Sequence, residues 1–316
     1  MLMLRFEKQL YELKDKIEEL KKTSEKSGSN MTEEIKNFEK AAEEFAEELY
    51  ANLTPSQKIQ IARHPERPNF QDFVDKMTEN FIEFHGDREG MDDRAIVGGP
   101  CEIEGIPVML IGTFKGKSTK ENLVHNFGMP QPQGYRKALR LFKHAERFNL
   151  PIVTLIDTPG AYPGIKAEET AQGTAIAVNL AEQAKLRVPI VAVITGEGCS
   201  GGALGLAVAN KVLMLEHSYY TVISPEGCAS ILWRDASLAD KAAEALKITA
   251  DDLLKFDIID DIVKEPQGGA HYDPDTTAKN LKKKIVKNLK ELMKLTPDEL
   301  RNKRYDKFRT KGVFVK

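Results

Sequence analysis

The sequence contains little cysteine, and its cysteines form no recognisable metal or disulfide pattern. Among 316 residues only Cys101, Cys199 and Cys228 are cysteines, and no two of them have CxxC spacing. An odd number of scattered cysteines excludes a disulfide framework and argues against a thiolate-rich metal site. We therefore expect no metal in this chain and a cytoplasmic location, where cysteines stay reduced.

An excess of charge of one sign and long apolar runs are also missing. Lysine and arginine number 46 and aspartate and glutamate 48, which gives a formal net charge of −2. That balance excludes the broad positive surface of a general nucleic-acid-binding protein. No apolar stretch reaches the roughly 18–20 residues of a membrane span, and the N-terminal residues lack the pattern of a secretory signal. With 41% hydrophobic residues, the composition predicts a soluble protein that binds neither membranes nor nucleic acid.

The charges that are present are unevenly distributed. Residues 1–50 contain 22 charged side chains and one glycine, whereas residues 151–232 contain 11 charged side chains and nine glycines. The first segment spaces its apolar residues by three and four in two stripes, which predicts two amphipathic helices joined by a polar turn. We expect an N-terminal helical hairpin over residues 1–60, since Pro55 and Pro65 then interrupt the pattern.

Strands alternate with helices in the remainder of the chain. The pattern predicts an antiparallel unit at residues 95–99, 101–104 and 107–112, further strands at 152–157, 189–195, 212–216 and 219–223, and helices at 132–148, 167–186 and 203–209. Such alternation indicates a layered α/β domain, which we expect over residues 61–316. The two central strands, 152–157 and 189–195, both end in glycine-rich turns, where ligand sites of such folds lie.

A phosphate-loop pattern follows one of the strands but does not fit nucleotide binding. Residues 112–118 read GTFKGKS, with only three residues between Gly112 and Gly116, whereas the phosphate-binding nest needs four. Gly128 and Pro130 also interrupt the long helix that should follow. We therefore expect no GTPase. The lysines of this region are better explained by a solvated loop than by contacts with a coenzyme A phosphate; they are Lys115, Lys117 and Lys120.

A second pattern resembles the nucleophile elbow of serine hydrolases. Residues 198–202 read GCSGG, which matches G-x-S-x-G with Ser200 as the nucleophile. His217 and His271 are the only histidines downstream, and neither has a distinctive placement. A tight turn that allows close packing of a helix on a strand explains the glycines as well. A serine hydrolase with Ser200 as its nucleophile remains an alternative.

A third interpretation joins the two glycine-rich turns, residues 157–164 and 196–203, into one site. Main-chain N–H groups from both turns would form an oxyanion hole that needs neither a histidine nor a metal. Glycine is required there because a Cβ would obstruct the close approach of the ligand oxygen. The second turn also opens a helix, whose positive dipole end favours an anion. The resulting hypothesis is an enolate-stabilising enzyme of the crotonase type that acts on acyl-CoA or biotin.

Nine longer segments carry a specific resemblance, and they occur in order along the chain. They are residues 83–88 (EFHGDR), 95–99 (AIVGG), 119–122 (TKEN), 126–129 (NFGM), 134–140 (GYRKALR), 156–164 (IDTPGAYPG), 200–203 (SGGA), 222–233 (VISPEGCASILW) and 268–271 (GGAH). Between about Phe70 and Pro274 the sequence closely resembles the alpha subunits of bacterial acetyl-CoA carboxylase carboxyltransferase, in the crotonase-like superfamily. The N-terminal hairpin is also in keeping with this family.

The resemblance implies a crotonase-like fold of repeated ββα units and activity only with a separate beta subunit, in an α2β2 heterotetramer. The family transfers a carboxyl group from carboxybiotin to acetyl-CoA, which gives malonyl-CoA for fatty-acid biosynthesis. The biotin is carried on the biotin carboxyl carrier protein, and biotin carboxylase is a further partner. In this family the alpha subunit chiefly holds the biotin, and the beta subunit supplies a zinc ribbon and most acyl-CoA contacts. Zinc is therefore implied in the beta subunit.

The resemblance also implies which residues form the site. In the family, carboxybiotin releases CO2 within the site, and the biotin anion takes a proton from the acetyl methyl group, so that no protein base is needed. The implied anion-stabilising N–H groups are those of Gly201 and Gly202 and, in the facing turn, Gly160 and Ala161. The implied cofactor contacts are Gly198, Ser200, Tyr162 and Pro163. We expect Gly202→Val to reduce turnover severely while the chain stays folded.

The sequence departs from the family pattern near this site. Cys199 replaces a usual glycine, so we expect backbone strain if that position has a positive φ, and a reactive thiol near the helix N-terminus. Thr170 and Ala171 replace a usual Arg-Gly pair, and Gln131 and Gln133 stand where histidine and glutamate are common. These changes leave open a low-activity paralogue with another acyl-CoA preference.

Overall fold

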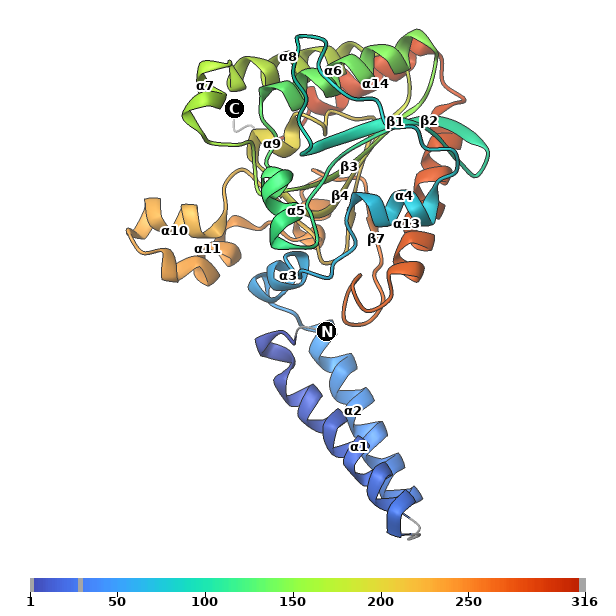
Figure 1. Cartoon of the computed structure of the whole chain (residues 1–316), viewed down its shortest axis with the longest axis vertical. Helices are drawn as coiled ribbons and strands as arrows, with labels where there is room; N and C mark the ends of the chain where they lie inside the picture. Colours follow the sequence, from blue (N-terminus) through green and yellow to red (C-terminus); the bar gives the residue numbers. More distant parts are fainter. Residues whose placement is uncertain (1–2, 28–30, 313–316) are drawn as a thin grey trace.

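A sheet of mainly parallel strands forms the centre of the molecule. The computed structural model describes residues 3–27 and 31–312 (Figure 1). The described strands are β1 (Ile96–Ile103), β2 (Ile106–Thr113), β3 (Ile152–Thr158), β4 (Ile190–Cys199), β5 (Lys211–Leu215), β6 (Tyr219–Thr221) and β7 (Asp261–Val263). The sheet order is β1-β2-β3-β4-β5-β7, with β6 paired to β4. Only β1 and β2 are antiparallel, so the predicted antiparallel unit and the layered α/β class are confirmed.

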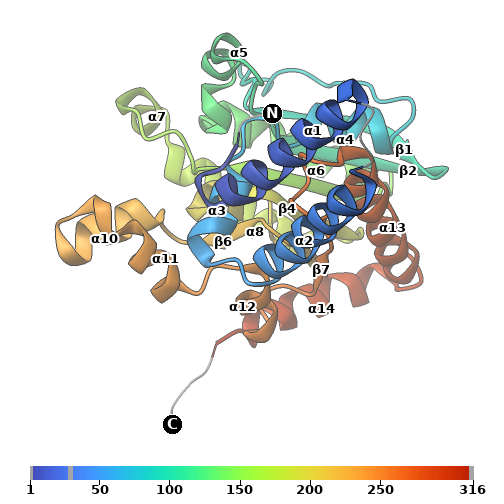
Figure 2. The same cartoon turned by 90° about the horizontal axis from the view of Figure 1, so that it is seen from below.

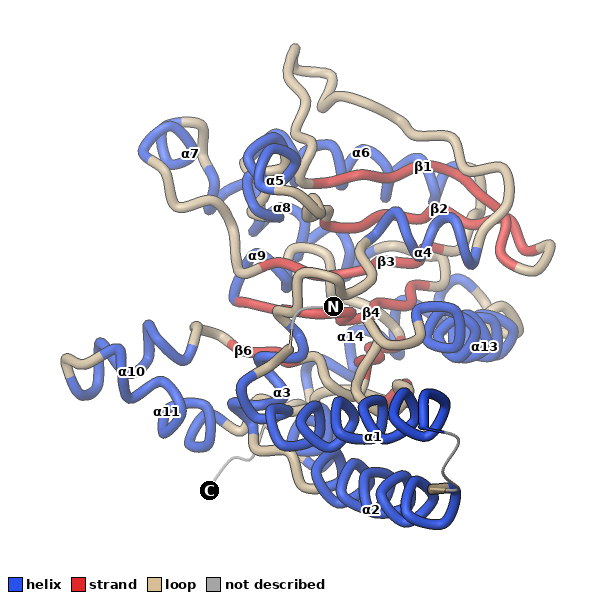
Figure 3. The backbone as a smooth tube through the Cα atoms, turned by 60° about the horizontal axis from the view of Figure 1, so that its bottom comes forward, coloured by secondary structure: helices blue, strands red, loops and turns tan. Residues whose placement is uncertain are grey.

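Helices cover both faces of this sheet (Figure 3). The described α-helices are α1 (Lys8–Ser27), α2 (Thr32–Ala51), α3 (Pro55–Ala62), α4 (Phe70–Met77), α5 (Thr119–Val124), α6 (Pro132–Arg147), α7 (Ile165–Glu169), α8 (Gln172–Lys185), α9 (Ser200–Leu204), α10 (Pro225–Trp233), α11 (Ala239–Leu246), α12 (Ala250–Lys255), α13 (Pro274–Leu292) and α14 (Pro297–Arg309). Side chains of α6, α8 and α9 belong to the core on one face, and those of α4 and α13 to the core on the other. None of the described helices is long and apolar enough to cross a membrane.

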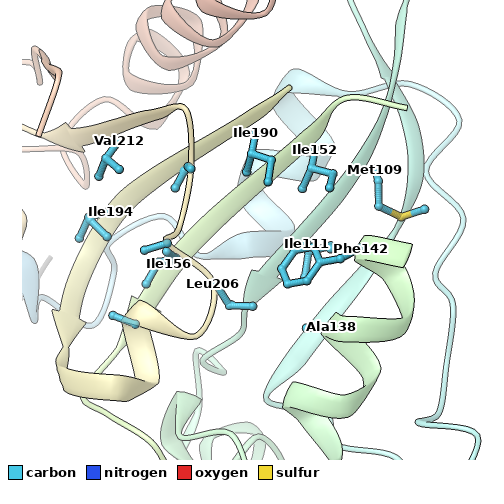
Figure 4. Packing of buried hydrophobic residues seen from close by; sticks show 14 of the residues in the cluster. Met109, Ile111, Ala138, Phe142, Ile152, Ile156, Ile190, Ile194, Leu206 and Val212 are labelled. Carbon is cyan, nitrogen blue, oxygen red and sulfur yellow. The ribbon is translucent and has the colours of Figure 1, made fainter. Parts of the chain in front are cut away.

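The alternation of side chains along the central strands explains the two cores. In β3, Ile152 and Ile156 point into the core under α6, whereas Val153 and Leu155 point into the core under α13. The residues of β4 alternate in the same way. Figure 4 shows the first core, in which Phe142 of α6 lies over the strands. Because successive side chains of a strand point to opposite faces, a continuous apolar run is what a sheet buried on both faces requires.

Three predicted elements differ from the structure at the ends of β3 and β4. The helix expected over residues 167–186 is two helices, α7 and α8, separated at Ala171, whose φ of +69° is left-handed. The strand expected to end at residue 195 continues to Cys199, since β6 pairs with its last residues. The following helix begins at Ser200 and ends at Leu204, not over 203–209. The second glycine-rich segment is therefore part strand and part helix.

The N-terminal helices form the expected antiparallel hairpin, which projects from the body of the molecule (Figure 1). Figure 2 shows its two helices side by side. Leu10 and Ile17 of α1 pack against Ala42 and Ala46 of α2, as the two apolar stripes predict. The Tyr11 hydroxyl lies 2.8 Å from the Tyr272 hydroxyl, and this contact links the hairpin to the body. Helix α3 then runs across residue 60, the predicted end of the hairpin segment.

Candidate functional site

The ends of β3 and β4 bring the two glycine-rich segments into direct contact. A Cβ added to Gly202 would lie 2.4 Å from the Ala161 nitrogen and 2.5 Å from the Gly160 carbonyl carbon. Only glycine permits such an approach between two backbones. The Tyr135 hydroxyl of α6 donates a hydrogen bond to the Gly202 carbonyl over 3.1 Å, which holds α9 in place. The two segments thus lie side by side, as the sequence pattern predicts.

Three main-chain N–H groups lie at this contact, and Gly202, which carries one of them, is buried. Helix α9 begins without a side-chain cap, and helical geometry leaves its first N–H groups, including those of Gly201 and Gly202, without a partner inside the helix. Within the described residues these two groups and the N–H of Ala161 find no other acceptor. Since Gly202 touches Ala161, the three donors belong to one small region of backbone.

Gly160 differs from its neighbours, and its predicted role as a donor needs correction. Its N–H donates to the Thr158 hydroxyl over 3.1 Å, and that hydroxyl donates in turn to the Gly160 carbonyl over 2.8 Å. The N–H is therefore occupied within the turn. Gly160 instead supplies a φ of +139°, which only glycine adopts readily, and so turns the chain toward Ala161.

A cavity of about 530 Å³ adjoins the start of α9. Ser200 and Gly201 form part of its wall, and most of the remainder is apolar, including Leu204, Val222 and Ile248. Lys311, whose ammonium is paired with the Asp257 carboxylate over 2.7 Å, lines the same wall. A ligand that covers this apolar surface would displace water from it and strengthen any charge interaction made with the nearby N–H groups.

The other predicted cofactor contacts do not line this cavity. Gly198 lies inside β4, paired with Thr158 on one side and Tyr220 on the other, so it belongs to the sheet rather than to a ligand site. Tyr162 donates its N–H to the Pro130 carbonyl over 2.9 Å and forms the turn with Pro163 that follows Ala161. Of the four predicted contacts, the structure thus brings only Ser200 to the cavity.

A partly buried network of charges lies beside the site and lines a second cavity, of about 280 Å³. The sequence patterns did not identify it. Lys115, interpreted from the sequence as a solvated loop residue, extends its ammonium between Asp157 of β3 and Glu197 of β4, at 2.7 Å from each carboxylate. Arg63 donates to the other oxygen of Glu197 over 2.8 Å, and the Tyr219 hydroxyl donates to that same oxygen. Lysine in a glycine-rich loop carries no sequence signal for such burial, because its partners come from distant segments.

The charges of this network hold one another ionised. Burial raises the pKa of Glu197, but Lys115 and Arg63 outweigh this effect and bring that pKa down to about 2. Burial lowers the pKa of Lys115, but Asp157 and Glu197 raise it by more. Lys115 therefore keeps its proton and is not a general base. Among the described residues, no group of three or more His, Cys, Asp or Glu side chains could hold a metal ion.

Comparison with known proteins identifies the family. Residues 3–312 match the family described as acetyl co-enzyme A carboxylase carboxyltransferase-like. The chain belongs to this family. It is 52% identical over 313 residues to the acetyl-coenzyme A carboxylase carboxyl transferase subunit alpha of Prochlorococcus marinus (strain NATL2A), covering 99% of this chain and 95% of the relative. It is 51% identical over 314 residues to the protein of the same name from Synechococcus elongatus, covering 99% and 96%.

Solved structures confirm that the chain has the crotonase-like fold expected of this carboxyltransferase family. Transcarboxylase 12S aligns with a TM-score of 0.59 and 18% identity, over 72% of this chain and 42% of that one. The beta subunit of Pseudomonas aeruginosa geranyl-CoA carboxylase aligns with a TM-score of 0.56 and 17% identity, over 76% and 46%. A Pseudomonas malonate decarboxylase hetero-dimer aligns with a TM-score of 0.54 and 14% identity, over 68% and 85%. The chain spans less than half the length of the first two chains.

The departures from the carboxyltransferase family pattern have different structural consequences. Cys199 has an extended backbone with φ −107°, so the expected strain is absent there. Burial raises the pKa of its thiol to about 11, which makes the predicted reactive thiol wrong. Ala171 instead occupies a left-handed position at φ +69°, where the family's usual glycine would be unstrained. The side-chain amide of Gln133 donates a hydrogen bond to the side-chain oxygen of Gln131 over 3.2 Å.

The arrangement around Ser200 does not complete a hydrolase triad. Ser200 itself is exposed and has φ +58°. The two downstream histidines lie in another part of the molecule: His217 donates its backbone N–H to Glu265, and His271 stacks on His64 with ring centroids 3.9 Å apart. The phosphate-loop pattern does not form a nucleotide site either. Its Ser118 caps the six-residue helix α5, where a phosphate loop would be followed by a long helix.

Proposed function

We propose that this chain is the alpha subunit of an acetyl-CoA carboxylase carboxyltransferase, which transfers a carboxyl group from carboxybiotin to acetyl-CoA and yields malonyl-CoA for fatty-acid biosynthesis. The observation that carries the proposal is the identity above 50% with alpha subunits of that name over 99% of this chain and 95% of theirs. The backbone donors beside an apolar cavity support it, because carboxyl transfer between two carbonyl compounds requires stabilisation of an oxyanion rather than a nucleophilic side chain.

The residues at the start of α9 fit a biotin ring and its developing charge. A Cβ at Gly201 would meet only Ile176, at 3.7 Å, so the side of this residue is open. The cavity next to it is large enough for a bicyclic ring and is lined mainly by apolar side chains. Carboxybiotin would supply the carboxyl group and, once it has released that group, the base for the acetyl methyl proton. The carrier-bound ring would lie against Leu204 and Val222.

In this proposal the chain contributes binding, charge stabilisation and exclusion of water. The N–H groups of Gly201, Gly202 and Ala161 donate to the oxygen on which negative charge develops. Because they are fixed by backbone geometry, they need no reorganisation during the reaction. Gly160 acts through the turn that presents Ala161. A ring bound against the apolar wall would displace water, which would protect the transferred carboxyl group and strengthen the hydrogen bonds.

The proposal includes several partners. A separate beta subunit would complete the active site in an α2β2 heterotetramer, and it would carry the zinc and most acetyl-CoA contacts. This fits the length of the chain, since it spans only 42% of the transcarboxylase 12S chain that has the same fold. The biotin carboxyl carrier protein would deliver the carboxyl group, and biotin carboxylase would load it. A cytoplasmic location stays a prediction.

The proposal is tested by assaying the chain alone and with the beta subunit of the same organism. We expect carboxylation of acetyl-CoA only with both subunits, and no labelling of Ser200 by a fluorophosphonate probe. Labelling of Ser200 in the isolated chain would favour the hydrolase alternative. Faster carboxylation of propionyl-CoA than of acetyl-CoA would favour the paralogue with another acyl-CoA preference.

A further inference from the structure

The ion pairs of Lys115 coincide with an irregularity in the sheet. Ile156 of β3 pairs with Ile194 of β4, but the next pair joins Thr158 to Gly198. Strand β4 therefore contains two residues more than β3 over this interval. Such a bulge bends its strand and changes the direction of the residues after it. Here it directs β4 into the first turn of α9, where the candidate donors lie.

Asp157 and Glu197 hold the two sides of this bulge. The Glu197 N–H donates to the Asp157 carboxylate over 2.8 Å, which joins the bulged strand to its neighbour. A Cβ at Gly196 would lie 2.5 Å from that carboxylate, so glycine is needed for the contact. Two like charges are thus brought together by the backbone. They require a shared cation, because their repulsion would otherwise separate the strands.

Lys115 is that cation, and contacts hold both its aliphatic stem and its ammonium group. It follows β2 closely, and its stem passes Gly128, where a Cβ would lie 2.6 Å from the Lys115 Cγ. Its ammonium then reaches both carboxylates at 2.7 Å. Ala161 lies four residues after Asp157, and Gly201 lies four residues after Glu197. Lys115 therefore binds the chain shortly before each of the two segments that carry the candidate donors.

We infer that Lys115 is a positioning residue for carboxyl transfer, which sets the spacing between Ala161 on one segment and Gly201 and Gly202 on the other. The inference rests on the proposed function for its activity readout and on the bulge for its geometry. Lys115 acts through Asp157 and Glu197 and does not touch the cavity beside α9. Without the charge of Lys115, the two carboxylates separate, and the N–H groups of the two segments no longer point at the same ligand oxygen.

The charged neighbours of Asp157 and Glu197 make the effect of removing Lys115 depend on pH. The groups facing the two carboxylates are Arg63 after α3, Lys115 after β2, Tyr219 of β6 and, through Arg63, Glu226 of α10. Removal of Lys115 leaves Arg63 as the sole cation bound to Glu197, so burial then raises the pKa of Glu197 from about 2. Protonation at lower pH would relieve the repulsion and restore part of the geometry.

The experiment compares Lys115→Met with Lys115→Arg and with the charge-balanced double variant Lys115→Met/Asp157→Asn. Each is assembled with the beta subunit. For Lys115→Met we expect kcat to fall by about 10²-fold, because a displacement of about 1 Å has such an effect, with the KM for acetyl-CoA changed less than about threefold. The loss should shrink as pH is lowered. Lys115→Arg and the double variant should each recover at least about tenfold, since both restore charge balance.

Lys117→Met is the matched control, because Lys117 lies in the same loop but is paired with Asp72 on the surface. Its activity should stay within about twofold of the wild type, as expected for an exposed ion pair. Backbone amide hydrogen exchange measures the effect on the local structure without an activity assay. Amides of residues 196–203 should exchange faster in Lys115→Met than in the wild type, while those of β2 should not.

The outcomes separate this inference from the proposed function. Activity of Lys115→Met within threefold of the wild type overturns the inference, as does an equal loss in all three variants without faster exchange at residues 196–203. If the wild-type assembly shows no carboxyl transfer, the proposed function fails, and the exchange comparison still decides the positioning role. If Lys115→Met does not fold, the positioning role of Lys115 is decided by the double variant and Lys115→Arg. Their carboxylation kinetics and their hydrogen exchange at residues 196–203 are then compared with those of the wild type.

Discussion

Gly201 and Gly202 are adjacent in the chain, yet a side chain would have different effects at the two positions. At Gly202 it would collide with the backbone of the facing turn, whereas at Gly201 its nearest neighbour would be Ile176 at 3.7 Å. The sequence expectation that Gly202→Val leaves the chain folded therefore needs correction, because the contact is between two backbones and cannot be relieved by moving a side chain. Gly201 is the better position for testing the donors.

We predict that Gly201→Val keeps the fold and lowers kcat by about 10²–10³-fold, the usual effect of losing one oxyanion-hole donor. The added side chain restricts access to the N–H group on the cavity wall. Gly202→Val should instead lower the melting temperature, because the turn must shift. The checks are carboxylation kinetics of the assembled enzyme and circular dichroism melting. Normal kcat for Gly201→Val, or an unchanged melting temperature for Gly202→Val, would contradict the geometry.

A cluster around His271 predicts how stability depends on pH. Burial, together with His64 and Arg67, lowers the pKa of His271 to about 3. Burial raises the pKa of Glu265, but Arg67 outweighs it and lowers this pKa to about 2. In the unfolded chain both groups bind a proton at higher pH than they do in the folded protein. The unfolded state therefore gains protons first as the pH falls, and acid destabilises the fold.

We predict that the free energy of unfolding falls as pH decreases from 6.5, by up to about 1.4 kcal/mol per pH unit for His271, with a further loss from Glu265 below about pH 4.5. Urea unfolding between pH 7.5 and 5 measures the slope. His271→Phe should flatten it, whereas His85→Gln should not, because the His85 side chain is 66% exposed. The explanation is wrong if the slope is the same in all three proteins.

At the scale of elements, the sequence predicts the strands better than their ends. The alternating faces of β1, β2 and β3 follow from local apolar patterns, and so do the seams of α1 and α2. The bulge of β4 does not, because it depends on Lys115, Asp157 and Arg63, which come from three separate segments. The same holds for the break at Ala171, since alanine gives no local signal for a left-handed residue. The bulge and the break, both beside the candidate site, are thus missed, and the sequence patterns also give no expectation for β7, α12, α13 or α14.

Helix α3 shows where the N-terminal unit ends. Its residues Ile59 and Ala62 pack with Cys199 and Tyr219 of the body, and Ile61 is fully buried. Arg63 follows directly and binds Glu197. We therefore propose that the separable hairpin ends before α3, although the sequence pattern puts its boundary at residue 60.

A chain that begins at Leu53 should retain the melting temperature of the body. A chain that begins at His64 should lose several kcal/mol of stability, because it lacks two isoleucines worth about 1.5–3 kcal/mol each and leaves Glu197 with one cation fewer. Thermal melting of the two truncated chains measures the difference. Equal melting temperatures would show that α3 belongs to the hairpin after all.

At the scale of the whole molecule, the net charge of −2 is an average over unlike parts. The charged hairpin projects from the body of the molecule (Figure 1). The central strands of the body are almost free of charge, and the few charges near their ends form the Lys115 network. Composition alone therefore indicates no site, because the candidate site consists of backbone groups.

We propose that this chain acts as one subunit of a two-subunit carboxyltransferase. The most direct test follows a labelled carboxyl group from loaded biotin carrier protein to acetyl-CoA. We predict labelled malonyl-CoA when both this chain and the beta subunit are present, and none when either is omitted. An assembled complex that receives the loaded carrier and forms no labelled malonyl-CoA, or the isolated chain forming it unaided, would contradict the account.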